Sequence, residues 1–149
     1  MPTSPRKVAD PPALSPLDAA LRQVGDRWTL LLVEALLRGD QRFGDLLDAL
    51  DGLAPNILSK RLKALEAGGL VTAAPYSRRP YRAAYALTAS GAELAGALRL
   101  LAQWGAGRDP SAAAALNHGT CGTPLEARWW CPTCTRTVEN DEAPDLDYV

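Results

Sequence analysis

Apolar and polar positions recur at helical spacing along most of the chain, most clearly over residues 53–70. Three leucines fall on one face at intervals of four and three residues: Leu58, Leu62 and Leu65. Pro55 suits the first helical position, and Gly68-Gly69 suits the end of the helix. The other face carries polar residues at i, i+3, i+4 and i+7: Asn56, Ser59, Lys60 and Lys63. The pattern therefore predicts an amphipathic helix with a short basic face.

The same spacing predicts three helices before this one. Ser15-Pro16 marks the start of a helix over 16–24, which Gly25 ends. A second helix, about 28–38, is nearly all apolar, which is typical of a central core helix. A third helix over about 43–50 is joined by the short turn Asp51-Gly52 to the helix that begins at residue 55. Two short helices joined by a tight turn, the second with a basic face, form the helix-turn-helix pattern.

The segments that follow predict a hairpin and a last helix. Two short strands, 70–74 and 82–87, flank the basic loop 75–81. Together they form a β-hairpin wing after the helix-turn-helix. Thr88 precedes a long helix that runs to about Trp104 and is more apolar than a lone surface helix needs. A second subunit would explain this excess. The predicted fold is therefore mainly α with a small β-hairpin wing, a winged helix-turn-helix over 14–108.

Composition and charge divide the chain further. Residues 1–13 are Pro-rich and polar and are expected to form a disordered arm, 109–117 a linker, and 139–149 an acidic, disordered tail. The net charge of −1 hides an uneven distribution, because residues 16–109 hold twelve Lys and Arg against ten Asp and Glu, whereas 110–149 hold two against six. DNA affinity would therefore depend on local clusters of charge.

The sequence lacks the features of a membrane or secreted protein. The longest apolar run, 28–37, is too short to cross a bilayer, and the N-terminus has no apolar signal region. We therefore expect a cytoplasmic protein with no membrane partner.

The polar face of the helix at 55 suits the major groove of double-stranded DNA, where Asn and Ser reach base edges and Lys meets guanine or phosphate. A solvated surface helix would show a similar pattern. Arg61 lies closer to the apolar side and would contact either phosphate or an internal acid such as Asp45. The candidate DNA-binding residues are four on this helix, three on the wing and one before the turn: Asn56, Ser59, Lys60, Lys63, Arg78, Arg79, Arg82 and Arg42.

Motifs in register over about ninety residues resemble the HxlR family of bacterial winged-helix transcriptional regulators. They include Gly25-Asp26-Arg27-Trp28-Thr29, Arg42-Phe43-Gly44-Asp45-Leu46, Leu58-Ser59-Lys60-Arg61-Leu62 and Tyr85-Ala86-Leu87-Thr88. The resemblance implies a homodimer that binds palindromic operator DNA, and we expect a repressor. A small-molecule effector bound near Trp28 and Trp104 is an alternative to the burial of these rings in a core or dimer interface.

The chain departs from the family pattern at two positions. Members that sense oxidants resemble one another in a cysteine just before the first helix, where this chain has Ser15. A serine hydroxyl forms no disulfide, so a thiol switch there is excluded. The second departure is Ala54, which replaces a capping serine before Pro55 at a cost of roughly 1 kcal/mol in helix stability.

All three cysteines and the only histidine lie within seventeen residues, 118–134, in the pattern H-x2-C-x9-C-x2-C. This spacing predicts a small zinc ribbon over 118–138, with a strand over 126–130 and one structural zinc per chain held by His118, Cys121, Cys131 and Cys134. The alternative is that the cysteines are reduced thiols in a flexible tail and bind no metal. A third interpretation makes Cys131 and Cys134 a redox pair whose oxidation ejects zinc.

The residues favour a regulator over other classes of function. The sequence contains no Ser/His/Asp set, phosphate loop or paired carboxylates, so we expect no enzyme activity. The low net charge supports one competing class, a winged helix that serves as a protein-interaction module. A regulator that responds to oxidation through Cys131 and Cys134 is the other alternative.

Overall fold

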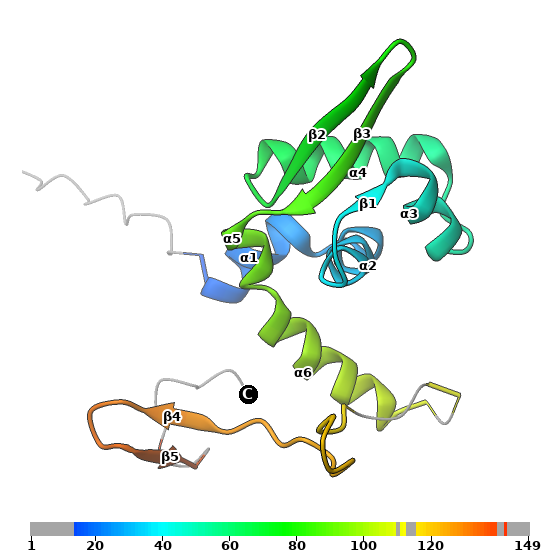
Figure 1. Cartoon of the computed structure of the whole chain (residues 1–149). Coiled ribbons are helices and arrows are strands. Elements are labelled where there is room, and N and C mark those ends of the chain that lie inside the picture. The colour runs from blue at the N-terminus through cyan, green and yellow to red at the C-terminus, as the bar shows by residue number, and fades with distance from the viewer. Residues whose placement is uncertain (1–13, 110, 113–115, 140–141, 143–149) are drawn as a thin grey trace, which may run out of the picture. The chain divides into compact units, whose positions relative to one another are not determined.

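The computed structural model describes residues 14–109, 111–112, 116–139 and 142, and the chain forms two compact units, 1–95 and 96–149 (Figure 1). The predicted arm over 1–13 and nearly all of the acidic tail lie outside the described residues. Among the described helices, none has the length and apolar character needed to cross a bilayer.

The first unit is a winged helix. Its helices are α1 (Pro16–Val24), α2 (Arg27–Leu36), α3 (Phe43–Ala49), α4 (Pro55–Ala67) and α5 (Ala89–Ala92). Its strands are β1 (Gln41–Arg42), β2 (Val71–Arg78) and β3 (Tyr81–Leu87), which form an antiparallel sheet in the order β1-β3-β2. The β2–β3 hairpin projects beyond the helices (Figure 1). The predicted winged helix-turn-helix is therefore confirmed, with the addition of β1, which the sequence pattern did not predict.

Two helices of the first unit begin at side-chain caps that the sequence predicts, and α4 begins without one. Ser15 Oγ accepts a hydrogen bond from the N–H of Asp18 at 3.1 Å, and Thr88 Oγ1 accepts one from Gly91 at 3.1 Å. Helix α4 begins after Ala54 without a side-chain cap and has Pro55 in its first turn, as expected from the sequence.

The core of the first unit lies between α2, α3, α4 and the base of the sheet. The largest fully buried side chains are Leu32, Leu46, Leu58, Leu62, Leu65 and Val33. Three of them form the predicted apolar stripe of α4, so the opposite face of that helix is directed to the surface.

The wing strands are longer than predicted. Residues 75–78 and 81 belong to β2 and β3, so the basic segment is mostly paired strand rather than loop. The register shifts between Pro75 and Ser77, which places the proline, with no N–H to donate, beside a bulge.

The predicted long helix after Thr88 is in fact two helices, α5 and α6 (Ala95–Ala106). The break falls at residues 93–94, and before it, inside α5, Gly91 packs closely on Leu70: a Cβ at this position would lie 2.1 Å from the carbonyl oxygen of Leu70. Thr88 holds the same chain segment, since its N–H donates to Leu70 O at 3.0 Å and its hydroxyl donates to Gly69 O at 2.7 Å. Tertiary packing therefore fixes the position of α5 against residues 69–70.

The second unit contains nearly all of α6, the strands β4 (Trp129–Cys131) and β5 (Arg136–Val138), and an antiparallel bridge between Asn117 and Pro124. The predicted strand over 126–130 is correct only at its end, because β4 begins at Trp129. Helix α6 has no buried residue, and its large apolar side chains Leu100, Leu101 and Trp104 are exposed.

The packing of Gly91 yields a prediction about stability. Gly91→Ala is expected to lower the free energy of unfolding by about 1–3 kcal/mol, because the added methyl group overlaps a backbone oxygen. Gly96→Ala is the matched control, since no atom lies within 4 Å of its added Cβ. That control is expected to leave stability unchanged or raise it by less than about 1 kcal/mol. Urea unfolding followed by circular dichroism measures both. Equal stability of the two variants would contradict the packing argument.

Candidate nucleic-acid interface

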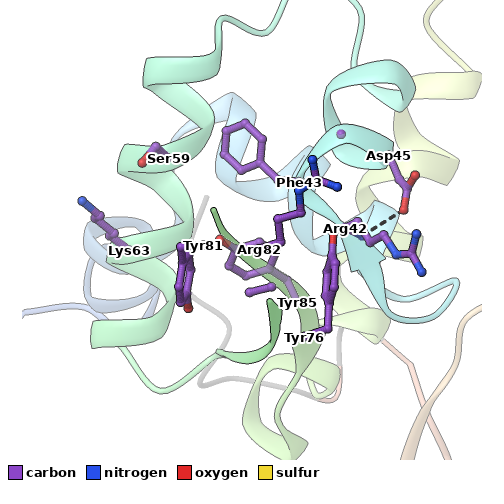
Figure 2. Close-up of a pocket in the computed structure, with 11 residues that line it drawn as sticks. Arg42, Phe43, Asp45, Ser59, Lys63, Tyr76, Tyr81, Arg82 and Tyr85 are labelled. Atoms are coloured by element: carbon purple, nitrogen blue, oxygen red, sulfur yellow. Dashed lines mark hydrogen bonds between the residues drawn. The ribbon is translucent and has the colours of Figure 1, made fainter. Parts of the chain in front are cut away.

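A cavity of ≈ 690 Å³ lies between α4, the start of α3 and the wing (Figure 2). Four of the predicted DNA-binding residues line it, although they come from distant parts of the sequence: Arg42, Ser59, Lys63 and Arg82. The fold thus gathers three cations and a hydroxyl around one concave surface. Such a surface can receive a phosphate backbone while α4 faces the groove beside it.

Three tyrosines complete the cavity, and the sequence reasoning missed them. Tyr76, Tyr81 and Tyr85 line its wing side (Figure 2). The Arg42 guanidinium lies 5.1 Å from the centre of the Tyr76 ring, a cation–π contact that orients this arginine. The signal was present in the sequence, because Tyr81 and Tyr85 are four residues apart and so share one face of a strand.

Tyr85 is a neutral hydrogen-bonding group at physiological pH. Burial raises the pKa of its phenol, with further contributions from Tyr81 and Glu66. A neutral phenol hydroxyl can donate a hydrogen bond to phosphate.

The other four predicted DNA-binding residues lie outside this cavity. Asn56 and Lys60 are exposed on α4, and the side-chain oxygen of Asn56 accepts a hydrogen bond from the N–H of Ile57 at 2.9 Å. Arg78 and Arg79 are exposed at the tip of the wing, where Arg78 pairs with Tyr81 across the strands. The candidate interface therefore has three parts: the exposed face of α4, the cavity and the tip of the wing.

Arg61 is half-buried and pairs with an acidic residue of the same chain, as one of its two predicted alternatives had it. Its Nη2 lies 2.8 Å from Oδ2 of Asp26, so the suggested partner Asp45 was wrong. Asp45 instead accepts a hydrogen bond from the N–H of Arg42 at 3.0 Å at the start of α3. Arg61 has turned toward α2 because Asp26 there offers a carboxylate about two thirds shielded from solvent, its side chain being 34% exposed. Its Nε is buried and has no hydrogen-bond partner among the described residues.

The predicted metal ligands form two separate pairs in the second unit. His118 Nδ1 lies 3.2 Å from Cys121 Sγ, and the N–H of Cys134 donates to Cys131 Sγ at 3.4 Å. Across the described part of the chain, no three potential ligands are gathered at one point. A single four-ligand centre is therefore not seen.

Hydrogen bonds within and beside each pair change the pKa values of the thiols. Thr123 and, to a lesser extent, His118 lower the pKa of Cys121 to about 7. Hydrogen bonding to Cys134 lowers the pKa of Cys131, and the same contact raises that of Cys134. The described structure keeps all three cysteines as free thiols.

Neither tryptophan suggested for an effector lines the cavity beside α4. Trp28 is half-buried in the first unit and contacts the Arg27 guanidinium, 4.7 Å from its ring centre. Trp104 belongs to the second unit and is 64% exposed.

Comparison with known proteins shows which family the chain belongs to. Residues 23–111 match the HxlR-like helix-turn-helix family, which accounts for more than half of the chain. The chain belongs to the HxlR family. Relatives of the chain in Mycobacterium and Bacillus subtilis are named as HTH-type transcriptional regulators.

Individual relatives and solved structures match most of the chain. An uncharacterized HTH-type transcriptional regulator of Mycobacterium tuberculosis, Rv3095, is 40% identical over 122 residues, 80% of this chain and 77% of its own length. A solved structure described as a transcription factor, PA1374 of Pseudomonas aeruginosa, is 32% identical with a TM-score of 0.66 and covers 85% of this chain and 88% of its own. The redox regulator HypR in its reduced form is 28% identical with a TM-score of 0.60, covering 64% and 96%.

The cavity yields a prediction for binding to non-specific double-stranded DNA. Lys63→Ala and Arg82→Ala are each expected to reduce the slope of log affinity against log salt by about 0.9 for each phosphate contact that a protomer loses. Arg22→Ala is the control, because this exposed arginine lies on α1 and pairs with Asp18 away from the cavity lining. Fluorescence anisotropy over a salt series measures the slopes. An equal effect of Arg22→Ala would show that only total charge matters.

Proposed function

We propose that this HxlR-family protein is a cytoplasmic homodimer that binds a palindromic operator sequence-specifically and represses transcription. The observation that carries the proposal is the cavity between α4 and the wing. It brings Arg42, Lys63 and Arg82 together beside the exposed polar face of α4. A face that reads bases next to a cluster that binds phosphate is the arrangement that a winged helix needs for specific DNA recognition.

In this proposal α4 lies in the major groove. Asn56 and Ser59 reach base edges there, and Lys60 and Lys63 contact guanine or the flanking phosphates. The wing lies over the neighbouring backbone, where Arg78, Arg79 and Arg82 contact phosphates or the minor groove. Arg42 contacts phosphate from the opposite wall of the cavity.

The exposed apolar side chains support the homodimer. On α1 Leu17 is 60% exposed and Leu21 is 51% exposed, and on α6 Leu101 and Trp104 are more than half exposed. A second copy that covers these helices would remove this apolar surface from water, at about 25 cal/mol for each Å² buried. Two α4 helices would then meet half-sites about one turn, roughly 34 Å, apart.

The decisive experiment measures binding of the purified protein to the DNA upstream of its own gene. With about four phosphate contacts per protomer, the dimer is expected to show a log–log salt slope near −7. Lys60→Ala/Lys63→Ala is expected to abolish specific binding, and Arg22→Ala to preserve it. Electrophoretic mobility shift and anisotropy across a salt series give both quantities.

Two results would contradict the proposal. A log–log salt slope near zero for binding at a specific site would exclude about four phosphate contacts per protomer. Failure of the folded dimer to prefer any palindrome over random DNA would favour the protein-interaction module instead.

The dimer has its own test. Leu101→Glu/Trp104→Glu is expected to yield a monomer with strongly reduced operator affinity, because carboxylates replace the apolar contact surface of α6. Arg99→Glu changes charge two residues before Leu101, on the other side of the helix, and is expected to remain dimeric. Sedimentation velocity distinguishes the states. A dimer that persists in the double variant would show that α6 is not part of the interface.

A further inference from the structure

The second unit contains a turn at residues 118–123 whose geometry is closed by backbone hydrogen bonds. The N–H of His118 donates to Thr123 O at 2.8 Å, and the N–H of Gly122 donates to His118 O at 2.8 Å. Asn117 and Pro124 pair across the turn, and the N–H of Leu125 donates to Leu116 O at 2.9 Å. Residues 116–125 therefore form a short hairpin with His118 and Cys121 at its tip.

The turn between β4 and β5 has the same construction. Its paired residues are Trp129 with Val138, Trp130 with Thr137 and Cys131 with Arg136. Adding thirteen to each residue number of the first hairpin gives the corresponding residue of the second: His118 becomes Cys131, and Cys121 becomes Cys134.

The correspondence includes the backbone. Gly122 and Thr135 occupy the same place, directly after the second ligand of each pair, and both have positive φ angles, 70° and 53°. Glycine adopts this conformation readily, whereas a β-branched threonine rarely does. Two different residues held in one uncommon conformation at equivalent positions indicate that both turns serve one geometric purpose.

We propose that the two turns are the halves of one zinc site, in which His118, Cys121, Cys131 and Cys134 hold a single Zn²⁺ in each chain. This site is additional to the DNA interface and does not depend on it. Three thiolates and one imidazole form a complete tetrahedral set for zinc, and four protein ligands leave no position for a reacting water. The zinc is therefore structural.

The exposure of this region explains why it needs a metal. Of the described residues 116–139, only Cys131 and Val138 are even half-buried, and all the others are exposed. So little apolar burial is not enough to stabilise the fold of a small module. The free energy of metal binding would therefore supply the free energy of folding.

The connection between the two hairpins allows them to meet. Residues 125–128 form no regular secondary structure, and the described residues hold no group of three potential ligands at one point. Zinc binding closes one hairpin against the other by bending this segment, which leaves the backbone pairing of each hairpin intact.

The test uses the full-length chain, purified under reducing conditions without chelator. Inductively coupled plasma mass spectrometry is expected to find one zinc per chain. Replacement of zinc by Co²⁺ is expected to give the intense d–d and thiolate charge-transfer bands of a tetrahedral site. Cys131→Ser, Cys121→Ser and His118→Ala are each expected to weaken Co²⁺ binding more than about tenfold, because even changes outside the ligand set cost about that much.

A matched control replaces the residues between the ligands. Thr120→Ala/Thr133→Ala changes one inner residue of each turn without removing a ligand, and is expected to retain full zinc content. Circular dichroism of the helices and DNA binding then show whether each variant keeps a folded first unit.

Three outcomes would overturn the proposal. The first is wild-type protein without stoichiometric zinc that binds no Co²⁺. The second is a Cys131–Cys134 disulfide in the absence of metal, which would assign these cysteines to a redox pair. The third is an unchanged Co²⁺ spectrum in His118→Ala or Cys121→Ser, which would exclude the first turn from the site.

Discussion

The leucine stripe of α4 has to be buried, and the direction of the candidate DNA-binding side chains of this helix follows from that burial. Leu58, Leu62 and Leu65 are at most 2% exposed and fill the space between α2, α3 and the sheet. Burial of a leucine side chain contributes about 1.5–3 kcal/mol, so these three outweigh the other contacts of α4 that the structure shows. Because a helix turns 100° per residue, fixing this stripe in the core leaves Asn56, Lys60 and Lys63 on the outside.

The ion pair between Arg61 and Asp26 adds a directional restraint to this burial. Asp26 uses Oδ1 to accept hydrogen bonds from the N–H groups of Trp28 and Thr29 at the start of α2, and Oδ2 to hold Arg61 of α4. One carboxylate thus caps one helix and fixes the rotation of another. Both side chains are about one third exposed, 30% and 34%, so the pair contributes at most about 1 kcal/mol. Its role is orientation more than stability.

The two units depend on different physical sources of order. The first unit has an apolar core, and its site is a cavity between elements that this core fixes. The described hairpins of the second unit have almost no buried side chains, and their order is local, in backbone pairing and turn conformation. The two candidate sites reflect this difference, because four candidate DNA-binding residues line one cavity, whereas the four candidate zinc ligands lie as two separate pairs.

The sequence by itself determined the features that depend on local periodicity and caps. The bounds of α1, α3 and α4, the buried stripe of α4, the wing and the spacing of the cysteine pairs all follow from residues close together in the chain. The resemblance to the HxlR family predicted more of the fold than periodicity did, because motifs in register fix the order of the elements.

Only the tertiary structure decided the features that depend on contacts between residues far apart in the sequence. Arg61 pairs with Asp26 rather than Asp45, thirty-five residues away instead of sixteen, because the fold brings the N-cap of α2 within 2.8 Å of the Arg61 guanidinium. The predicted long helix is divided at residues 93–94, after α5, which Thr88 and Gly91 hold against the backbone of residues 69–70. Tyr76, Tyr81 and Tyr85 join Arg42 and Lys63 around one cavity, because β1 pairs with β3 and brings the start of α3 beside the wing. Periodicity along a chain specifies which face of an element is buried, whereas the partner of that face is set by packing in three dimensions.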